Sequence, residues 1–229
     1  MKEFRIENVT QILKFENASE KLLNLGENFF LTKNSILVSP GYVPNGLYYV
    51  KDGRVKASTY SPNGNENIRG LQEKGSIFLE HNILFNIPTD CYFMTIEDSN
   101  ILFIKKEDLL NLLKADFDVM LFITQSITCK FMVTNHLLNE LLVYDSEWRI
   151  CRLLLTFADS FGMEIENKIK LNLKISQQFI SDMLGVNRAT TIRAIKKLKE
   201  MNLIEQTNGY YFIKDLQQLK KYQTELRVK

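Results

Sequence analysis

The sequence predicts an α+β fold in three parts: an antiparallel β-roll of the jelly-roll type, one long helix, and a C-terminal winged helix-turn-helix. Three observations predict it. Short apolar runs between turn signals fill the segment from Phe29 to Phe103, and the stretch from Ala115 to Val143 has neither Gly nor Pro. A basic helix-turn-helix pattern followed by a hairpin then ends the chain. We place the boundaries of the parts at residues 1–114, 115–144 and 145–229.

Charge is divided unevenly along the chain. Residues 1–144 carry 14 Lys and Arg against 17 Asp and Glu, whereas residues 145–229 carry 15 against 10. We therefore expect any polyanionic partner at the basic C-terminal part. The start of the chain lacks the apolar segment of a secretory signal, and the sequence has no run of 18 uncharged apolar residues. We expect a cytoplasmic protein with no membrane partner.

The predicted β-roll follows one or two short helices within residues 4–26. Its strands are rich in Ile, Val, Tyr and Phe and are separated by turn signals such as Lys51-Asp52-Gly53. All four prolines of the chain lie in this section, which suits loops and sheet edges rather than helices.

The helical section begins at Lys105 with a short helix starting near Glu107 and continues as the long helix. Along the long helix, residues at a 3-4 spacing form one stripe, which we call the seam residues: Phe117, Met120, Thr124, Ile127, Phe131, Thr134, Leu138 and Leu141. The stripe fits a core helix lying on the roll or a parallel coiled coil between two subunits, and we favour the homodimer. Leu121, Phe122, Thr128 and Leu142 lie beside the stripe and are expected to face the roll.

The C-terminal part opens with a helix that Asp145 caps and Gly162 ends. A polar connector with one short strand follows. Ser176 then caps a short helix, Gly185 makes the turn, and a second helix begins at Asn187 or Arg188 with an apolar side of Thr191, Ile192, Ile195 and Leu198. A strand, an Asn-Gly turn and another strand complete a winged helix-turn-helix.

The second helix has the chemistry of a DNA reader. Five basic residues and no acidic residue lie between Gly185 and Lys199. From the first turns of the helix, Arg188 and Arg193 can reach guanine edges in a major groove of double-stranded DNA. Phosphate contacts are expected from Ser176, Gln177, Gln178, Asn187, Thr190, Lys196, Lys197 and Thr207. The alternative is a protein-binding winged helix with a solvated basic face.

Four segments carry a resemblance to a known family: LYYVKDGRVK, GSIFLEHNILF, DSEWRICRLLLTFA and ISQQFISDMLGVNRATTIRAIKKLKEMNLI. Together they resemble the Crp/Fnr family of bacterial transcription regulators over nearly the whole chain. The resemblance implies a homodimer on a two-fold symmetric operator, with RNA polymerase as a partner. A transcription activator is expected, with repression as the alternative mode of control. It also places Arg188, Ala189 and Arg193 at the base-reading positions. Many members have a glutamate where Ala189 stands, so their operator sequence does not transfer.

The effector of this regulator is expected to be a small molecule other than cyclic AMP. Relatives that bind cyclic nucleotides carry a glycine before the acid that contacts ribose, and an arginine and a hydroxyl residue that follow and meet the phosphate. Here Leu79 precedes Glu80, and Thr89-Asp90-Cys91 stands at the later position. An uncharged ligand is expected among Tyr49, Leu79, Glu80, Tyr92, Phe131 and Thr134. The alternative is control without an effector, by a protein or by redox chemistry at Cys91 or Cys129.

No metal or other cofactor is expected. An iron–sulfur cluster needs four thiolates, and the chain has three cysteines. His81 and Cys91 leave haem open but show no recognisable ligand spacing. A cupin-like metalloenzyme needs clustered histidines, and the chain has two that are far apart. Without a Ser-His-Asp arrangement or a Walker-type loop, we expect a protein that is not an enzyme, and a cyclic-nucleotide-binding regulatory subunit would not need the basic C-terminal part.

Overall fold

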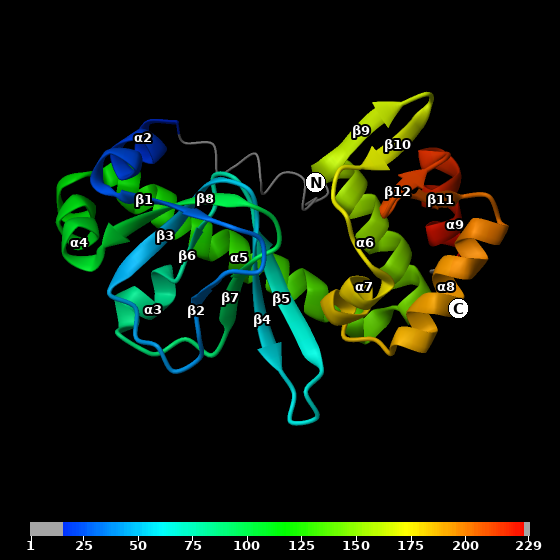
Figure 1. Cartoon of the computed structure of the whole chain (residues 1–229), viewed down its shortest axis with the longest axis horizontal. Coiled ribbons are helices and arrows are strands. Elements are labelled where there is room, and N and C mark those ends of the chain that lie inside the picture. The colour runs from blue at the N-terminus through cyan, green and yellow to red at the C-terminus, as the bar shows by residue number, and fades with distance from the viewer. Residues whose placement is uncertain (1–15, 227–229) are drawn as a thin grey trace. The chain divides into compact units, whose positions relative to one another are not determined.

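The computed structural model describes residues 16–226 and divides into two compact units, with the division between Thr134 and Asn135 inside one long helix (Figure 1). Of the helices expected within residues 4–26, the structure describes α2 (Glu16–Leu25), and the remainder lies outside the described residues.

The first unit contains two antiparallel sheets of four strands each. In the first sheet, β1 (Glu27–Leu31), β8 (Ser99–Lys105), β3 (Gly46–Asp52) and β6 (Ile77–Phe78) lie in that order. In the second, the order is β2 (Ile36–Val38), β7 (Tyr92–Thr95), β4 (Val55–Tyr60) and β5 (Glu66–Gln72). The Lys51-Asp52-Gly53 turn joins β3 to β4, with Gly53 at φ 83°. The predicted β-roll is confirmed.

Strand β3 shows how alternation divides the core of this unit. Leu47 and Tyr49 point to one face and pack with α2, α4 (Lys106–Ala115) and the long helix. Val50 points to the other face and packs with residues of both sheets, including Phe78 and Phe93. The rings of Phe78 and Phe93 stack with their centroids 4.7 Å apart. The β-roll therefore has one core between its sheets and a second under its helices.

The long helix α5 (Phe117–Val143) begins after Asp116, whose extended backbone separates it from α4. The Asp116 carboxylate accepts bonds from the backbone nitrogens of Asp118 and Val119 at 3.0 and 3.1 Å, which caps the helix. Phe122 is buried as expected, but the expectation for two of its companions is wrong, because Thr128 and Leu142 are exposed. The helical period instead buries Val119, Phe122, Ile123 and Ser126 on one face.

The described part of the second unit combines the end of α5 with a four-stranded sheet and the helices that follow it. Its sheet order is β11 (Ile204–Thr207), β12 (Tyr210–Ile213), β10 (Lys168–Leu171) and β9 (Gly162–Ile165). The helices are α6 (Ser146–Phe161), α7 (Gln177–Leu184), α8 (Arg188–Glu200) and α9 (Leu216–Leu226). Asp145 caps α6 by accepting from the Trp148 backbone nitrogen at 2.8 Å, and Gly162 ends this helix. The predicted winged helix-turn-helix is confirmed.

Two features of this unit differ from the sequence expectation. The polar connector holds two strands rather than one, because Glu166 and Asn167 both adopt positive φ, at 49° and 62°, and close a hairpin. The apolar side of α8 was also misassigned at one position. Ile192 is 40% exposed, whereas Ala194 is buried beside Thr191, Ile195 and Leu198.

Candidate DNA-binding surface and effector site

Capping residues fix the two helices of the helix-turn-helix. Ser176 accepts from the Phe179 backbone nitrogen at 3.0 Å at the start of α7, and Asn187 accepts from that of Ala189 at 2.8 Å at the start of α8. Gly185 ends α7 with φ 60°, the left-handed conformation that glycine adopts without strain. The two helices therefore begin and end where the predicted motif requires.

A buried hydroxyl pair ties α7 to α8. Ser181 and Thr191 are 3% and 0% exposed, and their side-chain oxygens lie 2.9 Å apart. A buried polar pair of this kind satisfies both hydroxyls and holds the two helices in one register. It leaves the opposite side of α8 exposed.

The exposed face of α8 presents the base-reading candidates near its N-terminus. Arg188, Ala189 and Arg193 are all exposed, and Ile192 lies one helical turn after Arg188 and Ala189. The Nη2 of Arg193 lies 3.4 Å from the Thr190 hydroxyl oxygen. The face thus combines two guanidinium groups with a methyl and an isoleucine side chain. Sequence reasoning missed Ile192, although an isoleucine among arginines and threonines was a signal for it.

The phosphate candidates differ in how they are held. Ser176, Gln178, Asn187, Lys196, Lys197 and Thr207 are exposed, while Gln177 and Thr190 are half-buried. Lys197 is engaged within the domain: its Nζ lies 2.9 Å from the Glu147 carboxylate on α6, and Tyr222 of α9 bonds to the same carboxylate. This pairing raises the pKa of Lys197 through its bonds to Tyr222 and Glu147. Lys196 makes a longer pair with Glu200 at 3.6 Å, so the structure favours Lys196 over Lys197 as the phosphate contact.

The wing has the expected turn and additional basic residues at its base. Asn208 and Gly209 have φ values of 53° and 83°, as a two-residue hairpin turn requires. Thr207 precedes this turn on β11. Lys170 and Lys174 place their ammonium groups 4.1 and 5.2 Å from the centre of the Tyr210 ring. The wing therefore extends the positive charge of the unit beyond α8.

The seam residues form an apolar surface that the single chain leaves open. Phe117, Phe131, Leu138 and Leu141 are 75%, 64%, 52% and 54% exposed, and Met120 is 45% exposed. Thr124 and Thr134 are also exposed, while Ile127 is half-buried. Among the described residues, α5 is the one helix whose length and apolar composition would allow it to cross a membrane. Of the 18-residue stretch of α5 on which this rests, 22% is buried. An apolar stripe of this length needs a partner surface.

The turn before α3 (Glu80–Phe85) keeps a glycine-like backbone without a glycine. Leu79 adopts φ 73°, in the left-handed region that costs a residue with a side chain roughly 1–2 kcal/mol. Its side chain is 1% exposed and packs in the core between the sheets. The backbone of Leu79 therefore adopts a conformation that glycine would adopt without strain, while its side chain fills space in the core.

Glu80 follows this turn and is bound from within the unit. Its side chain is 1% exposed, and its Oε1 lies 2.5 Å from the Lys130 ammonium and 3.1 Å from the Ser126 hydroxyl, both on α5. Lys130 also donates to the Ile77 carbonyl at 2.6 Å. The other oxygen of Glu80 has no hydrogen-bond partner among the described residues. The acid is thus neutralised by a lysine of the same chain, a pairing that the sequence analysis missed.

The six effector-site candidates do not converge on one cavity. Tyr49 and Leu79 belong to different core clusters, so their side chains pack rather than line a common space. Phe131 and Thr134 are exposed on α5, and Tyr92 is half-buried against Tyr60 at a ring distance of 5.4 Å. Glu80 alone combines burial with an unsatisfied polar atom. The structure therefore does not bring these six side chains together around one space, and the effector site stays a prediction.

The cysteines lack the features of redox sensors. Burial, with Asp90 beside it, raises the pKa of the Cys91 thiol to about 11. Burial also raises the pKa of Cys129, and it raises that of Cys151 to about 12. Because the thiolate is the reactive form, thiols with raised pKa values react slowly near neutral pH. The raised pKa values therefore argue against redox control through Cys91 or Cys129.

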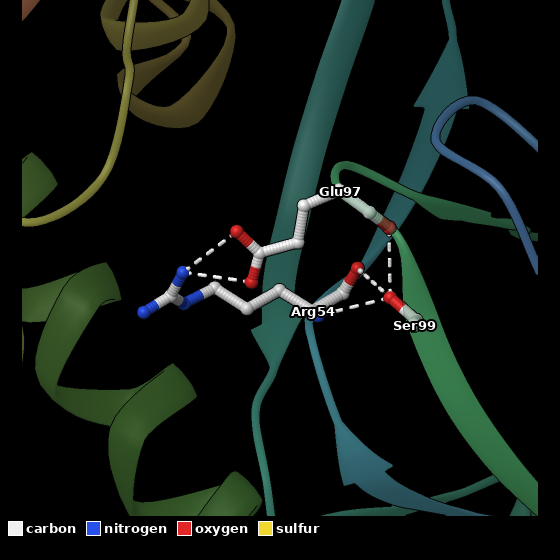
Figure 2. Close-up of polar contacts among 3 residues, drawn as sticks. All are labelled: Arg54, Glu97 and Ser99. Atoms are coloured by element: carbon white, nitrogen blue, oxygen red, sulfur yellow. Dashed lines mark hydrogen bonds and ion pairs between the residues drawn. The ribbon is translucent and has the colours of Figure 1, made fainter.

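A charged cluster lies at the end of the β-roll where β4 begins. Arg54 pairs with both carboxylate oxygens of Glu97 at 2.8 and 3.0 Å, and the Ser99 hydroxyl bonds to the backbone of both residues (Figure 2). Burial raises the pKa of nearby Glu73 to about 7; Arg54 opposes the shift and Glu97 adds to it. Arg54 therefore lies near two carboxyl groups, and the second of them, Glu73, keeps its proton to a higher pH than an ordinary glutamate does.

Within residues 16–226, no group of three or more His, Cys, Asp or Glu side chains is arranged to hold a metal ion. His81 is exposed and Cys91 half-buried, and neither has an arrangement of further ligands around it in that range.

Comparison with known proteins identifies both parts of the molecule. The model of the Crp-like helix-turn-helix domain matches residues 149–222, and that of the cyclic nucleotide-binding domain matches residues 29–116. The chain belongs to the Crp/Fnr family of transcription regulators. It is a DNA-binding regulator by family, and neither matching domain describes an enzyme.

The proteins similar to this Crp/Fnr regulator carry the names of different regulators. The global nitrogen regulator of Synechocystis sp. is 24% identical over 76% of this chain and 79% of its own length. The cAMP-activated global transcriptional regulator CRP of Haemophilus influenzae is 26% identical over 74% of this chain and 76% of its own. Among solved structures, a CooA variant from Carboxydothermus hydrogenoformans is 25% identical, covers 88% of this chain and 89% of its own, and has a TM-score of 0.74.

Proposed function

We propose that this protein is a cytoplasmic, sequence-specific transcription regulator that binds a two-fold symmetric operator as a homodimer. The exposed seam residues support the dimer, because an apolar stripe on a helix of 27 residues suits pairing with its own copy. Each copy then presents one α8 to one half-site. RNA polymerase is the second macromolecular partner in this proposal.

The exposed face of α8 is the single observation that carries this proposal. Arg188 and Arg193 offer planar forks that match the two acceptors on guanine. Ala189 and Ile192 are apolar on the same part of the helix and suit contact with thymine methyl groups. We therefore expect a half-site that pairs guanine with adjacent thymines and lacks the cytosine readout that a glutamate at position 189 would give.

Cyclic AMP is not the effector in this proposal. Glu80 is already bound to Lys130 and Ser126, and the Leu79 side chain occupies the core beside it. A ribose would have to displace an ammonium group from a buried carboxylate, which costs several kcal/mol. A small molecule other than cyclic AMP remains the first candidate for control. The Glu80–Lys130 pair favours a second candidate, a regulator that adopts its DNA-binding state without an effector.

Operator selection followed by substitution tests the DNA-binding proposal. The wild-type protein is used to select binding sites from random duplex DNA, and Arg193→Ala is compared with Lys196→Ala on the selected site. Arg193→Ala should lose about 1–3 kcal/mol of discrimination at one base position. Lys196→Ala should weaken binding to all sequences equally and lower the slope of log affinity against log salt by about one. Unchanged base preference in Arg193→Ala refutes the assigned readout.

A further inference from the structure

Arg149 is a buried cation in the first turns of α6. It is 9% exposed, and its Nη1 donates to the carbonyl oxygen of Leu184 at 3.1 Å. Burial lowers the pKa of Arg149, while the carboxylates of Glu140 and Asp145 act in the opposite direction. A buried charge is unfavourable unless neighbouring groups compensate it, so the partners of this guanidinium indicate its structural role.

The carbonyl that Arg149 binds lies at the turn of the helix-turn-helix. Leu184 is the last residue of α7, where backbone carbonyls lack partners within the helix. A cation is favourable at this end of a helix, yet α7 has no basic residue in its last turn. Arg149 supplies that cation from α6. The bond between Arg149 and Leu184 therefore fixes the end of α7, where the turn begins.

This turn sets where the base-reading residues begin. After Leu184 come Gly185, at φ 60°, and Val186, and then Asn187 caps α8 directly before Arg188. A displacement of the Leu184 carbonyl is passed through this short connection to the N-terminus of α8. A direct contact to a base edge depends on such placement, whereas attraction to phosphates is insensitive to it.

Glu140 brings the long helix into the same cluster. It lies near the end of α5 and is 4% exposed, with its Oε1 2.9 Å from the His136 ring and 3.4 Å from Nε of Arg152. It also stabilises the charge on Arg149. The last turns of α5 and the turn of the helix-turn-helix are thus both held by charged groups of α6.

We propose that Arg149 is a positioning residue for DNA recognition, which holds the turn between α7 and α8 through its bond to the Leu184 carbonyl. The inference rests on the proposed function, because it assigns Arg149 a part in operator discrimination without contact to DNA. Loss of Arg149 then lowers specific binding while leaving non-specific binding unchanged.

The test compares Arg149→Met with Arg149→Lys and with the matched control Arg152→Met. The control removes one positive charge from the same helix but not the bond to Leu184. Fluorescence anisotropy measures the affinity of the full-length proteins for the selected operator and for random duplex DNA, at several salt concentrations. Hydrogen exchange of the Gly185–Asn187 backbone amides reports on the turn itself.

Arg149→Met should bind the operator at least tenfold more weakly, with random-duplex affinity within twofold of wild type and an unchanged salt slope. Exchange at the turn should accelerate in this variant, Arg149→Lys should recover part of both properties, and Arg152→Met should resemble wild type. An unchanged specificity ratio, an equal loss in Arg152→Met, or a salt slope lowered by one overturns the inference. If Arg149→Met does not fold, the specificity ratio of Arg149→Lys decides. Failure of the wild type to select any site refutes the proposed function instead.

Discussion

Removal of Lys130 should expose how strongly the buried Glu80 depends on it. In Lys130→Met the carboxylate keeps one donor, Ser126, while remaining 1% exposed. Breaking a fully buried ion pair from one side costs about 3–5 kcal/mol. Because the Lys130 side chain is 37% exposed, water already screens part of the interaction, and we expect a loss of about 2–3 kcal/mol in the free energy of unfolding.

Substitution of both partners should cost less than the sum of the single changes. Glu80→Gln leaves a neutral amide in the site and a lysine that can reach water and still bond to Ile77, so we expect a loss of about 1 kcal/mol. In Lys130→Met combined with Glu80→Gln no buried charge is left uncompensated. The double variant should therefore be about as stable as Glu80→Gln alone, with a coupling of about 2 kcal/mol.

Urea unfolding followed by two probes measures this coupling and assigns it to the first unit. Trp148 is the single tryptophan of the chain and lies in the second unit, so its fluorescence reports on that unit. Circular dichroism reports on the whole chain. The losses should appear in the dichroism transition while the Trp148 midpoint stays constant. Strictly additive losses in the double variant would refute the reasoning, because they would show that Glu80 does not need Lys130.

Three further predictions concern the backbone, the titration and the dimer. Leu79→Gly should be no less stable than Leu79→Ala in thermal unfolding. Glycine avoids roughly 1–2 kcal/mol of left-handed backbone strain, which offsets its smaller side chain and its greater chain entropy in the unfolded state. An alanine variant that is clearly more stable contradicts this. The raised pKa of Glu73 means that the folded state holds a proton that the unfolded state has lost, so unfolding free energy should fall by about 1 kcal/mol as pH rises from 4.5 to 7. Glu73→Gln should flatten this dependence in urea titrations and Glu20→Gln should not; equal slopes in both variants contradict it. Phe131→Asp should give a monomer by light scattering and lose operator binding at least tenfold, whereas Met132→Asp, one position away from the seam residues, should stay dimeric; a dimeric Phe131→Asp refutes the seam.

Local signals in the sequence were enough for the architecture because each is decided within a few residues. Asp145 and Ser176 cap helices through their own side chains, and Gly185 and the Asn208-Gly209 pair supply positive φ where the chain must turn. The β9–β10 hairpin was missed because Glu166 is an unusual residue at positive φ. Its partner Asn167 was the available signal.

Contacts between residues far apart in the chain were beyond the sequence. Glu80 and Lys130 are 50 positions apart, and Arg149 and Leu184 are 35 apart. Nothing in the sequence separation of either pair marks these two residues as partners. The ion pair of Lys197 shows the same limit, because its partner Glu147 lies on another helix. Periodicity finds the face of a helix, but the partner of a particular side chain depends on tertiary packing.

In the effector-independent proposal, two features of the chain itself replace a bound nucleotide beside Glu80. Where relatives have glycine, Leu79 keeps the left-handed backbone and fills the space with its own side chain. Where a nucleotide would offer hydroxyl donors to the acid, Lys130 and Ser126 of α5 already bind Glu80. In the proposal of an effector-independent regulator, these bonds fix α5 against the β-roll as a bound ligand otherwise would. A ligand can shift the protein between states only through a difference in affinity for them, and a site already satisfied in one state offers little such difference. The same Lys130→Met variant therefore separates the two candidates: if it loses operator binding while keeping its dimer, the internal pair sets the DNA-binding state, and if it binds as wild type, control lies with a ligand or partner elsewhere.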